Sequence, residues 1–440
     1  MEKILNVKKK IKPFNKTIFV EGDKSLSIRW VLISSLSKKK SIAYNLLKSE
    51  DVINSINCIK SLGSKVKFNK NKCEIIGNGF HVKKKGKILI NAGNSGTLGR
   101  IILGLLINSK NKIKLIGDKS LSKRDFSRVI KPLKKFGAKF DTKKNLPLTM
   151  WGLENPKPIK YLETKGSAQC KTSIMFAALK STGTTEIKAK KSRNHTELLF
   201  KYLNIPIKIK ESKKFDIIKL KGINKINSLN YQIPGDISSC AFFLVLTILS
   251  DNSQLLIKNV NINSSRIGVI RILKRMGAII KFRNQKKYKG EKIADIKVKS
   301  PKTIKPINCP SKLNSGAIDE FLIIFLVAAK ANGVSYFKDL SELNQKESPR
   351  LKWGEYILNN MGVKTITTKD SIKIFGNPNL KINNKIIIKN YLKDHRVFMA
   401  SVIAALSFGG KWIIHDKHSI KTSFPNFLKI INKFNNIKYV

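Results

Sequence analysis

The sequence predicts an α/β protein that repeats one unit of strands and helices six times. A helical stretch ends at Gly or Asn and a short strand follows at once, and both residue types suit the left-handed conformation that closes a helix. The turn recurs roughly every 65 to 85 residues, at Gly63, Gly137, Asn204, Gly277, Gly362 and the Asn pair 435–436. Reuse of a common α/β turn would produce scattered matches, whereas near-even spacing favours a repeat.

Each predicted unit contains a strand, a helix, a second strand, a second helix and a closing pair of strands. Acidic or hydroxyl residues precede apolar runs at residues 49–52, 235–238 and 317–320, as they do at helix starts. The adjacent Pro234 and Gly235 suggest a boundary that leaves three units on each side. A chain of 440 residues is long enough for two or more domains.

The net charge of +59 would ordinarily suggest a nucleic-acid-binding protein. Lys is abundant everywhere, however, even in the apparent strand 385–389, so the charge reflects a chain-wide bias and no basic patch. Only 11 of the 87 basic residues are Arg, which leaves 76 Lys. Scarce Arg residues in Gly-, Ser- or Asp-rich junctions are candidates for binding oxyanions. They are Arg29, Arg100, Arg124, Arg193, Arg350 and Arg396.

The cysteines and apolar runs predict a cytoplasmic protein without a membrane partner. The five Cys are widely spread and form no CxxC pair, so neither a zinc site nor a disulfide framework is indicated. The first residues lack a secretory apolar core, and the longest apolar run, 321–329, is too short to span a bilayer.

Residues 22–29, GDKSLSIR, join an extended segment to an apolar run, where a strand becomes a helix. The first N–H groups of a helix have no partner within it and attract anions. Lys24 adds a mobile charge, Ser25 a hydroxyl and Arg29 a planar fork about one turn later. The pattern fits either a capped helix with surface cations or an anion site. It lacks the upstream Gly of a Walker A loop.

Other polar junctions also precede predicted helices. Residues 93–100 contain three Gly, which suit either a tight turn or close approach of the backbone to a ligand. The junction 192–197 contains His195, which by itself is more typical of a helix start or the surface than of catalysis. Asp319 could be an ordinary helix cap, Glu347 a solvated charge, and residues 394–396 a capping Asp with a surface Arg.

Considered together, these junctions predict a cleft that binds anions between two lobes. The cations would bind phosphates and carboxylates, and they are Lys24, Arg29, Arg124, Lys346, Arg350 and Arg396. Asp319 and Glu347 would then perform acid–base chemistry in a cationic site. This is the chemistry of transfer between two small anions.

The chain resembles the 5-enolpyruvylshikimate-3-phosphate (EPSP) synthase family along nearly its whole length. The motifs that carry the resemblance lie at residues 22–25, 93–97, 167–169, 192–197, 234–239, 318–320, 346–348, 394–396 and 423–425. The resemblance implies two inside-out α/β-barrel domains, each of three βαβαββ repeats. It places residues 1–22 and 235–440 in a C-terminal domain and 23–234 in an inserted N-terminal domain, with the active site in the cleft between them.

The same resemblance implies the substrates and the residues that bind them. Shikimate 3-phosphate would be held by Lys24, Ser25, Arg29, Ser167, Gln169, Ser192, Asp319 and Lys346. Phosphoenolpyruvate would be held by Lys24, Asn94, Gly96, Arg124, Gln169, Arg350 and Arg396. Asp319 would remove a proton from the 5-hydroxyl, and Lys24 or Glu347 would protonate C3 of phosphoenolpyruvate. No metal or organic cofactor, nucleic acid or partner chain is expected, so we predict a monomer.

A few positions depart from the family pattern. Asn344 stands where Arg is usual, and Pro349 stands where Asp is usual. Asp125 stands where Pro is usual, and Gly99 replaces a bulkier residue. All the charged ligands remain, so we expect activity. Gly96 leaves room beside the phosphoenolpyruvate pocket, and we therefore expect inhibition by glyphosate.

Two alternatives compete with this interpretation. The sister enzyme, UDP-N-acetylglucosamine enolpyruvyl transferase, shares the fold but typically carries a Cys before the residue that Arg124 matches, and this chain has no Cys between Cys73 and Cys170. A basic nucleic-acid-binding protein is suggested only by the charge, without a recognisable RNA- or DNA-binding motif.

Overall fold

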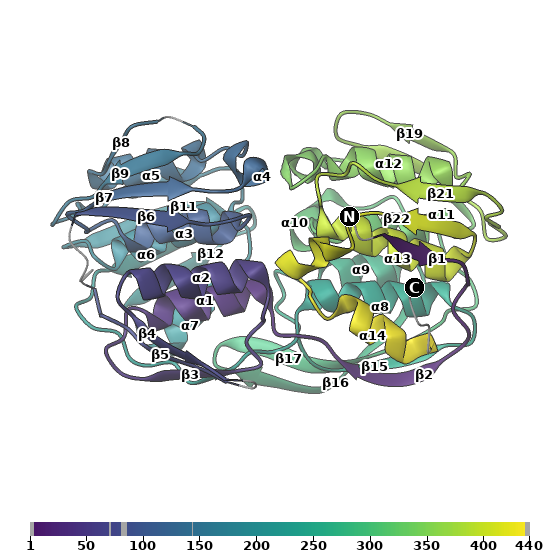
Figure 1. Ribbon diagram of the computed structural model, residues 1–440, viewed down its shortest axis with the longest axis horizontal. Coiled ribbons are helices and arrows are strands. Elements are labelled where there is room, and N and C mark those ends of the chain that lie inside the picture. Colours follow the sequence, from purple (N-terminus) through teal and green to yellow (C-terminus); the bar gives the residue numbers. More distant parts are fainter. Residues whose placement is uncertain (1–3, 70–71, 81–85, 143, 436–440) are drawn as a thin grey trace. The chain divides into compact units, whose positions relative to one another are not determined.

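A computed structural model describes residues 4–69, 72–80, 86–142 and 144–435 (Figure 1). The chain divides into two compact units. Unit 1 comprises Met1–Glu21, Pro234–Lys287 and Lys292–Val440, and unit 2 comprises Gly22–Ile233 and Tyr288–Glu291. The assignment of the hairpin tip Tyr288–Glu291 to unit 2 was not indicated by the sequence.

Unit 2 contains three four-stranded sheets among its described residues. The first sheet has the strand order β14 (Tyr231–Gln232), β3 (Ser41–Tyr44), β5 (Lys72–Ile76) and β4 (Lys65–Phe68). The second has the order β6 (Lys87–Asn91), β7 (Lys112–Ile116), β9 (Leu148–Trp151) and β8 (Lys139–Phe140). The third has the order β10 (Lys160–Glu163), β11 (Thr184–Lys190), β13 (Phe215–Lys221) and β12 (Ile207–Glu211). The helices are α1 (Lys24–Ser34), α2 (Glu50–Ser61), α3 (Gly96–Leu105), α4 (Lys119–Ser122), α5 (Ser127–Phe136), α6 (Ala168–Ala178) and α7 (His195–Tyr202).

Unit 1 contains one four-stranded and two three-stranded sheets within the described ranges. The four-stranded sheet has the order β16 (Ile279–Tyr288), β17 (Glu291–Lys299), β15 (Gln254–Asn261) and β2 (Asn15–Phe19). One three-stranded sheet has the order β18 (Gly333–Phe337), β20 (Ile372–Gly376) and β19 (Thr365–Thr367). The other has the order β1 (Leu5–Val7), β22 (Lys411–Ile414) and β21 (Lys385–Ile388). The α-helices are α8 (Ile237–Leu249), α9 (Gly268–Arg275), α10 (Asn314–Ala317), α11 (Phe321–Ala329), α12 (Arg350–Asn360), α13 (His395–Phe408) and α14 (Phe427–Asn435). Three 3-10 turns are η1 (Ser311–Leu313), η2 (Ser341–Gln345) and η3 (Lys417–Thr422).

One strand topology recurs through the chain and confirms the predicted βαβαββ repeat. In the sheet of β6 to β9, β6 and β7 run parallel, as a helical crossover requires, and β9 pairs antiparallel with both β7 and β8. The sheet of β10 to β13 repeats this order with α6 and α7 as its helices.

The turns that close the helices also have the predicted backbone conformation. The φ angles are positive at the five described positions, namely 99° at Gly63, 111° at Gly137, 56° at Asn204, 93° at Gly277 and 80° at Gly362. Of the sixth predicted turn, Asn435 is the last residue of α14, and the rest of the turn and the strand predicted after it lie outside the described residues.

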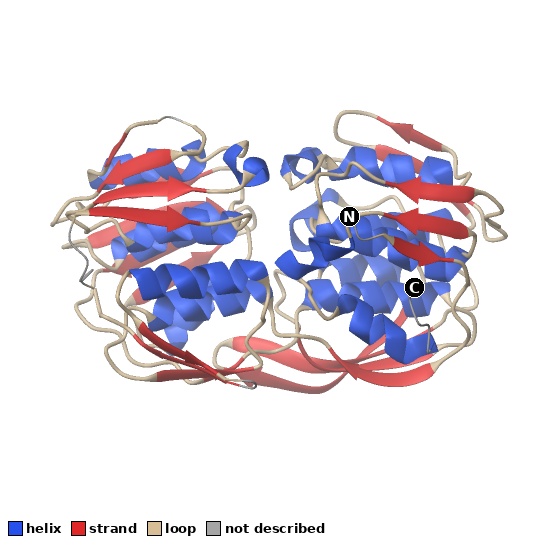
Figure 2. Ribbon diagram, in the orientation of Figure 1, coloured by secondary structure: helices blue, strands red, loops and turns tan. Residues whose placement is uncertain are grey.

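Both units are inside out, because their helices are buried and their sheets have one exposed face. Every residue of α8, α11 and α13 is buried, whereas β6 alternates between buried and exposed positions. Figure 2 shows the helices of each unit between its strands. One predicted detail is wrong: the strands of the described chain form separate sheets and no closed barrel.

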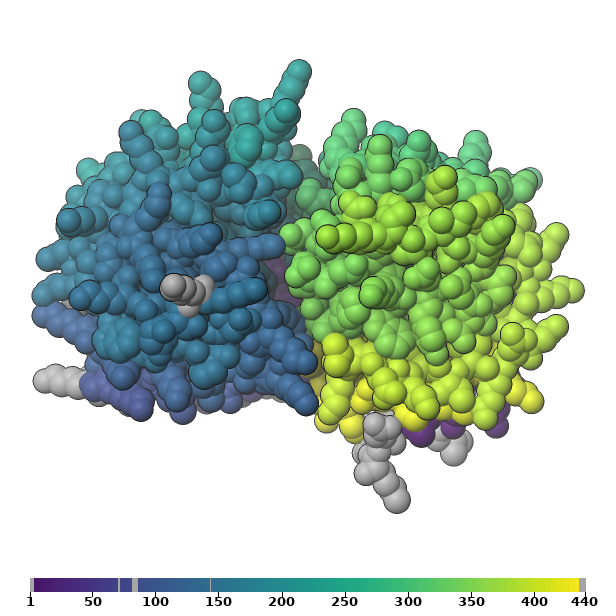
Figure 3. All heavy atoms as spheres, turned by 90° about the horizontal axis from the view of Figure 1, so that it is seen from above, coloured from purple at the N-terminus to yellow at the C-terminus, as the bar shows by residue number. Residues whose placement is uncertain are grey.

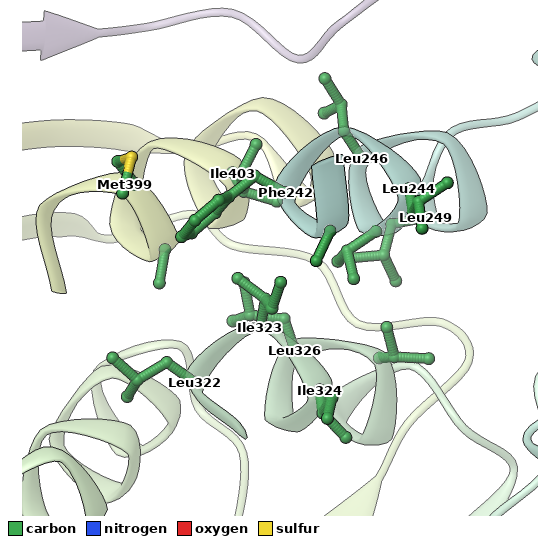
Figure 4. Close-up of a cluster of buried hydrophobic side chains, with 14 of the residues drawn as sticks. Phe242, Leu244, Leu246, Leu249, Leu322, Ile323, Ile324, Leu326, Met399 and Ile403 are labelled. Atoms are coloured by element: carbon green, nitrogen blue, oxygen red, sulfur yellow. The ribbon is translucent and has the colours of Figure 1, made fainter. Parts of the chain in front are cut away.

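Apolar side chains from three helices belong to the core of unit 1. Figure 4 shows Phe242 and Leu246 of α8, Ile323 and Leu326 of α11, and Ile403 of α13 in this cluster. The N-terminal strand β1 joins the same unit by pairing antiparallel with β22. Figure 3 shows this proximity at the surface, where purple N-terminal atoms lie among yellow C-terminal atoms.

Two helices of unit 2 pack closely because of one glycine. A Cβ added at Gly104 of α3 would lie 2.0 Å from the carbonyl oxygen of Ser173 in α6, so only Gly fits there. α3 begins at Gly96 and α6 begins at Ala168. The sequence motifs at residues 93–97 and 167–169 therefore lie at the starts of these two helices.

Candidate active site

The junction at residues 22–29 caps α1 and also places three polar side chains at the start of the helix. Asp23 is the N-cap and accepts a hydrogen bond from the backbone N–H of Leu26, with an N–O distance of 2.9 Å. The ammonium of Lys24 lies 3.0 Å from a carboxylate oxygen of Asp51. Arg29 is only 2% exposed and donates from Nη1 to the carbonyl of Ser25 at 3.1 Å. The capped helix and the polar junction therefore coexist.

The junction at 93–100 contacts residues 117–124, a segment that contains Arg124. Asn94 donates from Nδ2 to Asp118 at 2.6 Å and accepts from Nη2 of Arg124 at 3.2 Å. Gly96 begins α3 beside two guanidinium groups. A Cβ added to Gly96 would lie 2.9 Å from Nη1 of Arg100 and 3.2 Å from Nη1 of Arg124, so the glycine gives both groups room.

The start of α6 is tied to α3 through Gln169. The side chain of Gln169 accepts from Nη1 of Arg100 at 2.6 Å and donates to Thr97 at 3.0 Å. Ser167 is the N-cap of α6, and the preceding loop is ordered by Glu163. Its carboxylate accepts from the backbone N–H groups of Lys165, Gly166 and Ser167 at 3.1, 2.8 and 3.1 Å.

The junction at 192–197 precedes α7 and contributes a buried hydroxyl. Oγ of Ser192 is buried and makes no hydrogen bond with the described residues. His195 begins α7, as expected, but it is not a surface residue: it is fully buried and its Nδ1 lies 2.7 Å from Glu291. The sequence could not show this, because Glu291 is 96 residues away on the β16–β17 hairpin.

In unit 1, Arg350 and Asp394 form a buried bidentate pair. Nε and Nη2 of Arg350 donate to the two carboxylate oxygens of Asp394 at 2.9 and 3.2 Å. Asp394 also accepts from the hydroxyl of Ser348 at 2.8 Å and from the backbone N–H of Arg396 at 2.9 Å. Asp394 is therefore an N-cap of α13 and, at the same time, the residue that orients Arg350.

The predicted acid–base residues of unit 1 contact its predicted cations. Oδ1 of Asp319 lies 3.1 Å from the ammonium of Lys346 and 3.4 Å from Nη1 of Arg350. Arg350 also donates to Glu347, and Arg396 donates to the backbone carbonyl of Asp319 at 2.6 Å. The structure thus brings together all the site residues that the sequence predicted in the C-terminal half. With Asp394 they form the unit 1 cluster, defined as Asp319, Lys346, Glu347, Arg350, Asp394 and Arg396.

Burial and neighbouring charges change the pKa of several of these groups. Burial by itself would lower the pKa of Arg350, but the carboxylates of Asp394, Glu347 and Asp319 outweigh it and raise the pKa. Burial would likewise raise the pKa of Asp394, yet the Arg350 guanidinium lowers it below its usual range. Burial, followed by repulsion from Arg124 and Arg128, lowers the pKa of Arg100 to about 10.

The predicted residues of unit 2 lie near the starts of its helices, and short contacts join some of them in pairs: Arg29 with Ser25, Arg124 with Asn94, and Arg100 with Gln169. We define the unit 2 group as Lys24, Ser25, Arg29, Asn94, Gly96, Arg100, Arg124, Ser167, Gln169 and Ser192. Arg100 was singled out as a scarce Arg but received no role, although its contact with Gln169 places it in the group. Asp394 was missed because a capping Asp gives no local signal of a distant Arg.

Three general features complete the description. Among the described residues, no helix is long and apolar enough to cross a membrane. No group of three or more His, Cys, Asp or Glu side chains suited to a metal ion occurs in that part of the chain. All five cysteines are buried free thiols.

Sequence comparison finds one family along most of the chain. The family described as EPSP synthase (3-phosphoshikimate 1-carboxyvinyltransferase) matches residues 8–431. A 3-phosphoshikimate 1-carboxyvinyltransferase from Petrotoga mobilis is 34% identical over 96% of this chain and 98% of its own length. The protein of the same name from Ruthia magnifica is 37% identical over 96% and 97% of the two chains.

Comparison of the fold gives a consistent result. An EPSP synthase structure from Acinetobacter baumannii superposes with a TM-score of 0.85 at 32% identity and covers 98% of both chains. The enolpyruvyl transferase NikO from Streptomyces tendae has a TM-score of 0.77 at 12% identity, over 99% of this chain and 98% of that one. The second similarity concerns the fold alone.

Proposed function

Because the chain belongs to the EPSP synthase family, we propose that it transfers the enolpyruvyl group of phosphoenolpyruvate to the 5-hydroxyl of shikimate 3-phosphate and releases phosphate. This reaction is a step of the shikimate pathway. The observation that carries the assignment of roles is the unit 1 cluster, in which Asp319 contacts both Lys346 and Arg350. Asp319 is thus a carboxylate in a fixed position among cations, where it can act as a general base.

The residues proposed for shikimate 3-phosphate come from both units. Lys24, Ser25, Arg29, Ser167, Gln169 and Ser192 belong to unit 2, and Asp319 and Lys346 to unit 1. The buried hydroxyl of Ser192, which makes no hydrogen bond with the described residues, supports this role, because buried polar groups normally have a partner.

The residues proposed for phosphoenolpyruvate are Lys24, Asn94, Gly96, Arg124, Gln169, Arg350 and Arg396. Nη2 of Arg124 is directed by Asn94 at 3.2 Å, and Arg350 is directed by Asp394. Guanidinium groups held in this way match the planar oxygens of a carboxylate or phosphate. A side chain at position 96 would meet the guanidinium groups of Arg100 and Arg124. This proximity to two cations supports the proposal that Gly96 lies beside phosphoenolpyruvate.

The proposed reaction is an addition followed by an elimination. Asp319 accepts the proton of the 5-hydroxyl while that oxygen bonds to C2 of phosphoenolpyruvate, and Lys24 or Glu347 donates a proton to C3. The tetrahedral intermediate then loses a proton from C3 and expels phosphate from C2, which restores the carbon–carbon double bond. Fixed cations stabilise the charge that develops in both steps. A monomeric state and a cytoplasmic location remain predictions.

Phosphate release from the purified full-length chain tests the proposal. We expect release from phosphoenolpyruvate only when shikimate 3-phosphate is present. Release with UDP-N-acetylglucosamine in its place would assign the chain to the sister activity. Salt-sensitive binding of RNA without any phosphate release would instead favour a nucleic-acid-binding protein.

A further inference from the structure

Arg29 is held on one edge of its guanidinium group by two buried threonines from different helices. Nε donates to Oγ1 of Thr196 in α7 at 2.9 Å, and Nη2 donates to Oγ1 of Thr172 in α6 at 3.2 Å. The two hydroxyl oxygens are 2.8 Å apart and hydrogen-bond to each other. Both threonines are 1% exposed, so water does not replace these contacts.

A buried ion pair lies beside the two threonines and joins the same helices. Lys171 of α6 and Glu197 of α7 are the neighbours of Thr172 and Thr196, and their charged atoms are 2.5 Å apart. The side chain of Lys171 is fully buried and that of Glu197 is 4% exposed. Removing one partner of such a pair would leave an uncompensated charge, so the pair is a second buried link between α6 and α7.

We infer that Thr172 and Thr196 are positioning residues for shikimate 3-phosphate, because they set the plane of the Arg29 guanidinium. The inference rests on the proposed function, in which Arg29 binds that substrate. The guanidinium is planar, and hydrogen bonds at Nε and Nη2 fix its rotation. Thr172 lies in α6, whose first turn includes Gln169 after the N-cap Ser167, and Thr196 lies in α7, which follows the loop that contains Ser192. The contacts of Arg29 with the two threonines therefore join it to the helices that position the other proposed ligands.

Replacing each threonine by Val or by Ser separates this role from packing. Val keeps the shape but cannot accept a hydrogen bond, whereas Ser keeps the acceptor and loses a methyl group. For Thr172→Val and Thr196→Val we expect the KM and the calorimetric Kd for shikimate 3-phosphate to rise about tenfold, the size of one lost charge-assisted hydrogen bond. The KM for phosphoenolpyruvate should stay within about twofold, and the Ser variants should bind like the unaltered chain.

A double substitution provides the second measurement. Arg29→Lys keeps the charge but lacks the fork that reaches both threonines, so Thr196→Val should add little once Arg29→Lys is present. Additive effects of the two changes on the Kd would overturn the inference, since they would show that Thr196 acts without Arg29. If one Val variant does not fold, the other carries the test.

The outcomes distinguish this inference from the proposed function. If the unaltered chain turns over both substrates and the Val variants match the Ser variants, the positioning role is wrong and the function stands. Equal rises in both KM values would also overturn it, because they indicate a general structural effect. If the unaltered chain releases no phosphate with shikimate 3-phosphate, both proposals fail.

Discussion

Arg350 of the unit 1 cluster is held in a different way from Arg29 and Arg100 of the unit 2 group. In unit 1, Arg350 contacts Asp319, Glu347 and Asp394, so carboxylates surround the guanidinium. In unit 2, the hydrogen-bond partners of Arg29 include two hydroxyls, and those of Arg100 are an amide and a carbonyl oxygen. Neutral partners orient a cation without cancelling its charge. In the proposed function, Asp319 therefore acts beside the carboxylate-bound Arg350, whereas Arg29 is oriented for shikimate 3-phosphate by hydroxyl groups.

The largest expected effect comes from removing the proposed base of unit 1. Asp319→Asn keeps the shape of the side chain but cannot accept the hydroxyl proton, so we expect kcat to fall about a thousandfold while shikimate 3-phosphate still binds. Phosphate release and calorimetry measure the two quantities. The control is Asp251→Asn, which alters an exposed ion pair with Lys10. Turnover near that of the control would show that Asp319 is not the base.

Breaking the pair that orients Arg350 should destabilise unit 1. Asp394→Asn removes the charge that compensates a buried guanidinium, and we expect a loss of about 3 kcal/mol in the free energy of unfolding. Urea denaturation measures it. In the unaltered chain the pKa of Asp394 is lowered, so its contribution is present above the pKa of an unfolded Asp and is lost as the pH falls through the folded value. A variant as stable as the unaltered chain would contradict the buried pair.

Two glycines of α3 form a matched pair in unit 2. Gly96→Ala would place a methyl 2.9 Å from Arg100 and 3.2 Å from Arg124, so both side chains must shift. We expect the KM for phosphoenolpyruvate to rise about tenfold, and inhibition by glyphosate to weaken, because positioning is sensitive to small displacements. The methyl group of Gly99→Ala would lie 3.4 Å from the nearest atom, in the ring of Phe126, which is an ordinary contact distance. This substitution should therefore leave the KM for phosphoenolpyruvate and the inhibition by glyphosate unchanged. Equal effects of the two substitutions would remove Gly96 from the proposed site.

The smallest expected effect concerns a lysine outside the proposed site. Burial lowers the pKa of Lys180 to about 7, and its ammonium donates to Asn108 at 2.8 Å and to the carbonyl of Phe80 at 3.1 Å. Between that value and the ordinary lysine pKa the unfolded chain binds more protons, so stability should rise with pH across this range. Lys180→Met should reduce the rise, measured by denaturation at several pH values. The control is Lys110→Met, because the side chain of Lys110 is 72% exposed. If stability rises with pH as steeply in Lys180→Met as in Lys110→Met, the pKa of Lys180 is not lowered.

The sequence predicted features that depend on nearby residues and missed those that depend on distant ones. Gly63 and Asn204 predict their turns correctly because only a few residue types tolerate a positive φ. The role of Asp394 depends on Arg350, 44 residues earlier, and a capping Asp looks the same with or without that partner. Thr172 lies within an ordinary helical segment and gives no signal at all. The scarcity of Arg did identify Arg100, but its role required the contact with Gln169.

The pairing of β1 with β22 has a consequence for how the chain folds during synthesis. Val7 and Trp412 are partners, so about 400 residues must leave the ribosome before β1 can pair. At typical synthesis rates this takes tens of seconds. During that interval residues 5–7 lack their partner strand, and unpaired strand edges are prone to aggregation. Lys8, Lys9 and Lys10 follow it directly, and their charges discourage another nascent chain from adding to the strand.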